Sequence, residues 1–276
     1  MSDLTGVEVA VFEGRRATEI AALVRAGGGE VVAAPSVEIA LLDAGPDLVE
    51  MAAALREGRL DGVLFLTGVG VHALVDLVSP IMARDELLRT LASVPLGARG
   101  PKTVAALAEL GLTDVVQSHP PHDWRALLQA FDRAHPVGGR HIALQESGSV
   151  HALMRSALDD AGAHVLPVAV YRWVLPHDVS PLNAAIDALV SRRVRVALFT
   201  SEQQIGHAMA VASERDMDEP LRAALRDAVV GAIGPVTAER LRAFGIEPAL
   251  VSFRGTMGDL VAIVAARAKQ LLQERP

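Results

Sequence analysis

One segment of this chain occurs twice, and the repeat limits the folds that the chain can adopt. Gly97-Ala-Arg-Gly-Pro-Lys-Thr103 and Gly231-Ala-Ile-Gly-Pro-Val-Thr237 share the pattern Gly-x-x-Gly-Pro-x-Thr, at an offset of 134 residues (231 − 97). Each copy follows an apolar run and precedes an amphipathic segment that ends at Gly111 or Gly245. Because proline favours the first helical turn and glycine the position after a helix, each copy predicts a strand, a tight turn and a helix.

The predicted turn has the features of an anion site. Glycine adopts backbone conformations that a Cβ would forbid, and the N–H groups of a first helical turn have no partners within the helix. Such N–H groups bind anions readily. A plain strand-to-helix connection, with the threonine as a helix cap, is the alternative interpretation of a single copy. The second copy weakens that alternative.

Other landmarks repeat at nearly the same spacing. Pro35 and Pro167, which close two predicted strands, are 132 residues apart (167 − 35). Thr67 and Thr200, each at the end of an apolar run, are 133 residues apart (200 − 67). Alternating strands and helices of this length predict mostly parallel sheets covered on both faces. The sequence therefore predicts an α/β protein made of two similar parallel-sheet domains from a duplicated unit.

The extended segments after the two prolines indicate how the domains connect. If residues 36–42 and 166–173 pair as a two-stranded connector, the chain crosses once into a middle domain and returns once. We then expect a discontinuous domain of residues 1–35 plus 174–276 and a second domain of residues 43–165. A simple tandem arrangement, divided near residue 137, is the alternative.

Composition and charge exclude several classes of protein. With 276 residues, 51% of them hydrophobic, the chain can bury two cores of ordinary size. It has no cysteine, which excludes disulfides and thiolate metal sites. The net charge of −7 argues against nucleic-acid binding through bulk electrostatics, and no segment approaches the roughly 18 uninterrupted apolar residues of a membrane span. We expect a cytoplasmic monomer without nucleic-acid or membrane partners.

Six segments, taken in order, resemble the uroporphyrinogen-III synthase family, and together they extend over nearly the whole chain. They are Gly14-Arg15-Arg16, Leu66-Thr67-Gly68-Val69-Gly70-Val71, Arg99-Gly100-Pro101-Lys102-Thr103, Val170-Tyr171, Phe199-Thr200-Ser201 and Ile233-Gly234-Pro235-Val236-Thr237-Ala238. The resemblance implies two α/β domains, one of them discontinuous, with the substrate in the cleft between them. It also implies a hydro-lyase of tetrapyrrole and heme biosynthesis. Such an enzyme cyclises hydroxymethylbilane to uroporphyrinogen III with loss of water and inversion of ring D, and uses no cofactor or metal.

The resemblance also implies site residues. Tyr171, the only tyrosine in the chain, matches the family's connector tyrosine and is our candidate proton donor. A phenol of ordinary pKa is protonated at neutral pH; an aromatic ring that only packs on a connector strand is the alternative. For the substrate carboxylates we expect turn N–H groups, cationic side chains and two family threonines, beyond the carboxyl ends of the strands. These candidates are Arg15, Arg16, Thr67, Gly68, Arg99, Gly100, Lys102, Thr103, Thr200, Ser201, Gly234 and Thr237, with Arg172 as a further cation.

Some positions depart from the family pattern. Glu202 would bring negative charge toward an anionic substrate, and Val229 stands where some members carry a cation. The segment His119-Pro-Pro-His122-Asp123 fits a loop in which Asp123 caps the next helix better than a metal site, and we predict no metal site. Two other functions stay open: a non-catalytic tetrapyrrole-sensing relative, and a two-lobed binding protein for another anionic small molecule.

Overall fold

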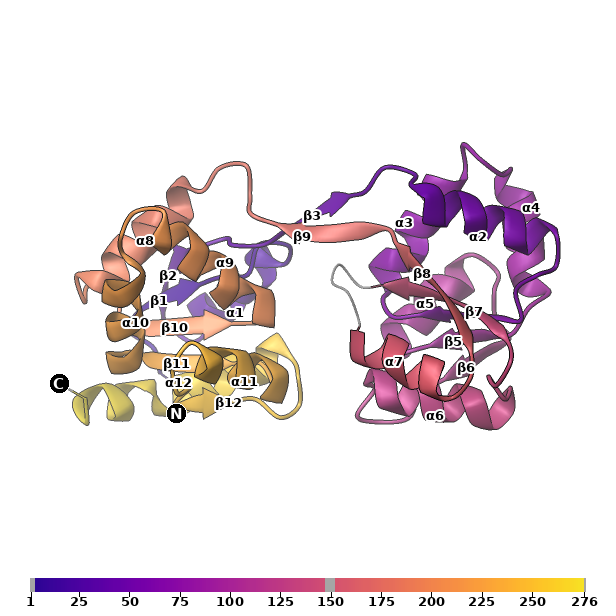
Figure 1. Ribbon diagram of the computed structural model, residues 1–276. Helices are drawn as coiled ribbons and strands as arrows, with labels where there is room; N and C mark the ends of the chain where they lie inside the picture. Colours follow the sequence, from indigo (N-terminus) through magenta and orange to yellow (C-terminus); the bar gives the residue numbers. More distant parts are fainter. Residues whose placement is uncertain (1–2, 147–151, 276) are drawn as a thin grey trace. The chain divides into compact units, whose positions relative to one another are not determined.

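The computed structural model describes residues 3–146 and 152–275, which form two compact units (Figure 1). The first unit combines Met1–Glu38 with Val174–Pro276, and the second unit is Ile39–Trp173. Each unit contains a five-stranded sheet, and a third sheet has two strands. This architecture confirms the predicted fold class, with two similar parallel-sheet α/β domains, one of them discontinuous, and a two-stranded connector.

The sheet of the second unit has the strand order β6-β5-β4-β7-β8, and all neighbouring strands are parallel. Parallel neighbours need crossover connections, which the helices supply. In chain order the elements are α2 (Pro46–Arg56), β4 (Gly62–Phe65), α3 (Gly68–Val78), α4 (Arg84–Ala92), β5 (Leu96–Ala98), α5 (Pro101–Glu109), β6 (Val115–Gln117), α6 (Trp124–Ala134), β7 (His141–Glu146), α7 (Ala152–Asp160) and β8 (His164–Ala169).

The sheet of the first unit has the strand order β12-β11-β10-β1-β2 and is also parallel throughout. The start of the chain supplies β1 (Glu8–Val11), α1 (Ala17–Ala26) and β2 (Glu30–Ala33). The end of the chain supplies α8 (Ser180–Val190), β10 (Val196–Phe199), α9 (Glu202–Ser213), α10 (Asp218–Asp227), β11 (Val229–Ala232), α11 (Pro235–Ala243), β12 (Leu250–Val251) and α12 (Met257–Gln273).

The two units have the same topology. Strands β10, β11 and β12 correspond to β4, β5 and β6, and strands β1 and β2 correspond to β7 and β8. In the second unit, α6 follows β6 and leads directly to β7. In the first unit, the equivalent helix α12 is the last element of the chain and the equivalent strand β1 is the first. The predicted duplication is therefore confirmed, with one copy split between the two ends of the chain.

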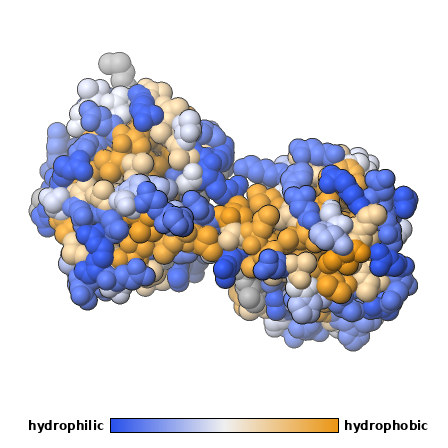
Figure 2. Space-filling model, turned by 90° about the horizontal axis from the view of Figure 1, so that it is seen from above, coloured by the Kyte–Doolittle hydropathy of each residue, from blue (hydrophilic) through white to orange (hydrophobic). Residues whose placement is uncertain are grey.

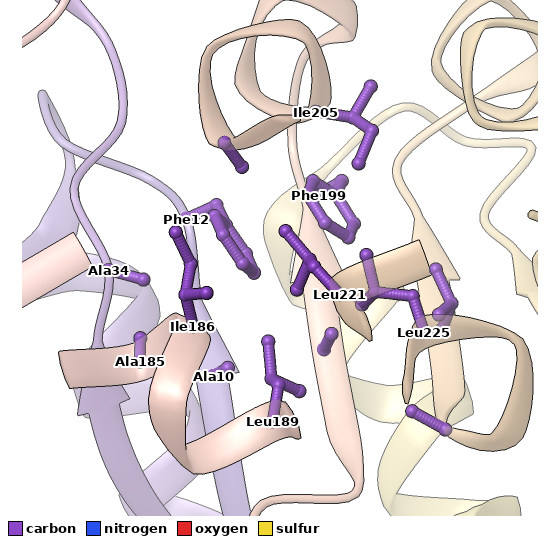
Figure 3. Packing of buried hydrophobic residues seen from close by; sticks show 14 of the residues in the cluster. Ala10, Phe12, Ala34, Ala185, Ile186, Leu189, Phe199, Ile205, Leu221 and Leu225 are labelled. Atoms are coloured by element: carbon purple, nitrogen blue, oxygen red, sulfur yellow. The ribbon is translucent and has the colours of Figure 1, made fainter. Parts of the chain in front are cut away.

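Helices cover both faces of each sheet. Successive residues of a strand point to opposite faces, and the apolar ones pack against helices on each side. In the first unit, Phe12 and Phe199 stack with ring centroids 4.4 Å apart on the face covered by α8, α9, α10 and α11 (Figure 3). Val9 and Val196 face the other way, against α1 and α12. In the second unit, α2 to α5 cover one face and α6 and α7 the other. Each fully buried large side chain contributes about 1.5–3 kcal/mol.

The connector consists of β3 (Glu38–Leu41) and β9 (Tyr171–Val174), which pair as an antiparallel ladder. Beyond the end of β3, the Leu42 N–H donates to the Val170 carbonyl at 3.1 Å. Strand β8 continues to Ala169 in the sheet of the second unit, so β9 follows it almost directly.

The structure corrects the prediction about the glycines of the repeated turn. Gly100 and Gly234 are the N-cap residues of α5 and α11, and their φ angles of −170° and 177° are extended, so their backbone does not require glycine. Gly97 lies within β5, where a Cβ would come within 2.6 Å of Leu64 Cδ2. At Gly231 in β11 a Cβ would come within 2.9 Å of Leu198 Cδ2. At the first glycine of each copy, an added Cβ would therefore displace a packed side chain.

The surface is mixed in character. In the view of Figure 2, hydrophilic residues cover much of each unit and apolar residues form smaller areas between them. Among the described residues, no helix combines the length and the apolar character needed to cross a membrane.

Candidate functional site

Three central strands of the second unit end side by side. Phe65 of β4 pairs with Ala98 of β5 and with Gln145 of β7. The residues that follow these strands, including Thr67 and Arg99, therefore lie at one edge of the sheet. This carboxyl edge is where open α/β sheets bind ligands.

The Tyr171 hydroxyl lies at this edge. Its oxygen is 3.2 Å from the Thr67 hydroxyl oxygen, and either group can be the donor. Thr67 is the N-cap of α3 and also accepts a hydrogen bond from the Gly70 N–H at 3.0 Å. The Tyr171 ring is buried in the core of the second unit, edge-on to Trp173 with centroids 5.3 Å apart. The core thus fixes the ring while the hydroxyl reaches the end of β4.

Arg99 supplies a cation beside this hydroxyl. Its side chain is half-buried, and burial lowers the pKa of the guanidinium, an effect opposed by Tyr171 and Asp123. An arginine remains charged even so. Among the described residues none forms a hydrogen bond or an ion pair with the Arg99 guanidinium. A desolvated cation without a protein partner favours a carboxylate ligand, which can form charge-assisted and bidentate hydrogen bonds with it.

The backbone donors expected around Thr67 are partly used within the protein. The Gln145 side-chain oxygen accepts from the N–H groups of Leu66 at 3.2 Å and Thr67 at 3.3 Å. At Gly70 a Cβ would overlap the Gln145 side chain, with 2.2 Å between the atoms. At Gly68 a Cβ would meet the Lys102 carbonyl oxygen at 2.8 Å. Gly68 therefore permits close packing of α3 against α5, and the Thr67 N–H is not available to a ligand in this arrangement.

The remaining candidates of the second unit lie in the first turn of α5. Lys102 is exposed, and Gly100 precedes it as the N-cap. Thr103 is buried, and Gly100 occupies the cap position, so capping by the threonine is not its role. The same holds for Thr237 in α11, whose N-cap is Gly234. The alternative interpretation of these threonines as helix caps is therefore wrong.

In the first unit, Thr200 and Ser201 belong to a closed hydrogen-bond network. The Gln204 side-chain oxygen accepts from the Thr200 N–H at 2.7 Å and from the Ser201 N–H at 3.3 Å. The Gln204 amide donates to the Thr200 hydroxyl at 2.8 Å, and that hydroxyl donates to the Glu13 carboxylate. The polar groups expected to bind substrate here already have partners.

The two candidate arginines of the first unit are at the surface. Arg15 and Arg16 are exposed, and Arg16 forms an ion pair with Glu19, with Nε and Oε2 2.8 Å apart. Val229 is fully buried at the start of β11, at the opposite end of the strand from the repeated turn. Glu202 is the first residue of α9.

The structure thus gathers the sequence-predicted residues into two groups. Thr67, Gly68, Arg99, Gly100, Lys102, Thr103 and Tyr171 lie in the second unit, and Arg15, Arg16, Thr200, Ser201, Gly234 and Thr237 lie in the first unit. Arg172 is exposed on β9.

Sequence reasoning missed Gln145, Gln204 and Glu13, which organise these turns. Only Gln204 carries a local signal, because Ser201 and Gln204 form a capping box, a pattern that sequence alone can show. Asp123 is the N-cap of α6 and accepts from the Ala126 N–H at 2.8 Å, as predicted.

Comparison with known proteins gives a consistent result. A family model described as Uroporphyrinogen-III synthase HemD matches residues 18–262. The chain is 29% identical to YjjA, an uncharacterized protein of Bacillus subtilis (strain 168), over 95% of this chain and 96% of that protein. It is also 29% identical to a putative uroporphyrinogen-III synthase of Methanothermobacter thermautotrophicus, over 91% of this chain and 94% of that protein.

A solved structure has a similar fold. The crystal structure of a mutant uroporphyrinogen III synthase from the extremely thermophilic bacterium Thermus thermophilus matches with a TM-score of 0.68 and 26% sequence identity. The match covers 98% of this chain and 100% of that chain. The likeness therefore includes both units.

Proposed function

This chain belongs to the uroporphyrinogen-III synthase HemD family, and on that premise we propose that it cyclises hydroxymethylbilane to uroporphyrinogen III. One observation supports this proposal most: the Tyr171 hydroxyl lies 3.2 Å from the Thr67 hydroxyl, and Arg99, a cation without a protein partner among the described residues, lies in the same unit. A proton donor next to an anion-binding group is what the reaction needs.

The proposed reaction begins with loss of the terminal hydroxyl of hydroxymethylbilane. Tyr171 protonates this hydroxyl, which leaves as water, yielding a protonated (cationic) azafulvene and the Tyr171 phenolate. A substituted pyrrole carbon then attacks the azafulvene carbon to form a spiro intermediate, whose rearrangement inverts ring D. When the rearranged pyrrole regains aromaticity it releases one proton, which restores the tyrosine. The net change is the loss of one water, and the active site mainly orients the reacting ends.

Cationic side chains would hold the substrate carboxylates. Arg99 and Lys102 serve this purpose in the second unit, where no internal ion pair has to be broken among the described residues. Arg16 of the first unit would exchange Glu19 for a substrate carboxylate. Because surface pairs of this kind are worth about 0.5 kcal/mol, that exchange costs little.

The isomer ratio of the product tests the proposal. Hydroxymethylbilane closes spontaneously to uroporphyrinogen I, so the purified protein is supplied with freshly generated hydroxymethylbilane and the isomers are separated after oxidation. We expect isomer III to dominate. If isomer I alone forms although the protein binds the bilane, the chain is a non-catalytic relative; if it does not bind the bilane, the proposal is wrong.

A further inference from the structure

The loop between β6 and α6 has a counterpart in the first unit. Gln117 of β6 pairs with Ala98, and Val251 of β12 pairs with Ala232. The next residue in each unit is a serine, whose N–H donates to the carbonyl of that partner at 3.1 Å for Ser118 and at 2.9 Å for Ser252. The two loops therefore leave equivalent strands at equivalent points, and their differences can be compared directly.

Both loops have a left-handed residue just before the helix. In the first unit Gly255 has φ +66° and precedes Thr256, the N-cap of α12. In the second unit His122 has φ 59° and precedes Asp123, the N-cap of α6. Glycine adopts this conformation without steric cost, whereas a residue with a Cβ is disfavoured there by about 1 kcal/mol or more. The left-handed conformation thus explains the glycine at 255 but does not by itself explain the histidine at 122, so the contacts of the ring have to be considered.

The His122 ring is held in one orientation. Its Nδ1 lies 2.9 Å from the Ser118 carbonyl oxygen and 3.3 Å from the Ser118 hydroxyl. A carbonyl oxygen only accepts hydrogen bonds, so Nδ1 carries the hydrogen, and in the neutral ring Nε2 is then an acceptor. Among the described residues no hydrogen bond to His122 Nε2 is formed. The fixed tautomer leaves one acceptor for another molecule.

The anchor of this ring is part of the candidate site. Ser118 is buried, and its hydroxyl donates to the Arg99 carbonyl. A Cβ placed on Gly100 would lie 3.5 Å from the Cβ of His122. The imidazole therefore stands beside the Arg99-Gly100 turn, where the other candidate groups, Arg99 and Lys102, are hydrogen-bond donors.

We infer that His122 is a substrate-binding residue whose Nε2 accepts a hydrogen bond from a pyrrole N–H of the tetrapyrrole. A linear tetrapyrrole presents two kinds of polar group, carboxylates that accept and pyrrole N–H groups that donate. Arg99 suits the first kind, and His122 Nε2 suits the second. This inference rests on the proposed function and adds a contact to the pyrrole rings themselves.

The test replaces His122 with the residue that the first unit uses. In His122→Gly the acceptor is lost. Relief of the left-handed backbone opposes the loss of the Nδ1 hydrogen bond to the Ser118 carbonyl, so we expect the melting temperature to change by no more than a few degrees. Because His122→Gly loses one neutral hydrogen bond to the substrate, we expect its KM for hydroxymethylbilane to rise about threefold to tenfold, with a smaller change in kcat. His119→Ala, in the same loop and exposed, is the matched control and should keep the KM of the unaltered protein.

The outcomes separate this inference from the proposed function. If the unaltered protein forms isomer III and His122→Gly has the same KM, the inference is wrong and the proposed function stands. If His122→Gly melts several degrees lower, the ring has a structural role, which also overturns the inference. If the unaltered protein neither binds nor converts hydroxymethylbilane, both fail together.

Discussion

Tyr171 serves the core and the candidate site with different parts of its side chain. Its ring packs among buried residues such as Val168 and Val170, and its hydroxyl meets Thr67 at the end of β4. An aromatic residue often combines an apolar body with a polar tip in this way. The ring position is therefore set by packing and does not depend on the hydroxyl.

This division predicts a selective effect of Tyr171→Phe. The ring stays packed and the hydrogen bond to Thr67 is lost, and loss of that bond should lower the free energy of unfolding by about 0.5–1.5 kcal/mol. Loss of the proton donor should lower kcat for isomer III formation about 100-fold or more. Single-turnover kinetics and urea unfolding measure the two effects. Trp173→Phe, which alters the packing on the same strand but keeps the phenol, is the control. Unchanged turnover in Tyr171→Phe would remove the tyrosine from the mechanism.

At the scale of single elements, the strands that lead into the repeated turn, β5 and β11, pack closely against neighbouring side chains at a glycine. Gly97 and Gly231 occupy equivalent positions in β5 and β11. At Gly97 a Cβ would lie 2.6 Å from Leu64 Cδ2 and 2.8 Å from Phe131 Cδ2. Distances under 3 Å force neighbouring side chains to move. The glycine thus lets a helix approach the sheet just before the strand reaches the site.

We expect Gly97→Ala and Gly231→Ala to destabilise the protein by about 1–3 kcal/mol each, because an added methyl group overfills a packed core. The effect should be larger at Gly97, where the contacts are shorter. Gly258→Ala is the control, and it should raise the free energy of unfolding. Gly258 lies exposed in α12 with no atom near an added Cβ, and alanine favours the helix. Urea unfolding measures all three. Equal stability of Gly97→Ala and the unaltered protein would contradict the packing argument.

The elements themselves follow from local patterns. Helices α3 and α9 begin at Gly68 and Glu202, directly after Thr67 and Ser201, which act as caps. The contacts that organise the site are not local: Gln145 reaches the Thr67 N–H across 78 residues of sequence, and the Thr200 hydroxyl reaches Glu13 across 187. Hydrophobic periodicity carries no information about such polar partners, so the turns could be predicted but not the use of their N–H groups.

At the scale of the whole molecule, both units have the same topology. In the first unit, α12 and β1 are adjacent in this topology but belong to opposite ends of the chain. The Asp3 N–H donates to the Ala265 carbonyl at 3.0 Å, and the Asp3 carboxylate lies 2.6 Å from Lys269 Nζ, so the start of the chain lies against α12. Strand β1 sits between β10 and β2 in the sheet and supplies Ala10 and Val9 to the two cores of the first unit.

A rearranged fragment tests whether the first unit folds by itself. Residues 174–276, joined by a short Gly/Ser linker to residues 1–38, would place the first unit's elements in the chain order of the second unit. Because this fragment contains both cores of its unit, we expect it to be monomeric and to unfold cooperatively. Residues 174–276 alone lack β1 and β2, leave an edge of β10 unpaired, and should aggregate. Size-exclusion chromatography and thermal unfolding followed by circular dichroism distinguish the two. If the joined fragment stays unfolded although the intact chain folds, the first unit depends on the second for its stability, and the expectation that it folds by itself is wrong.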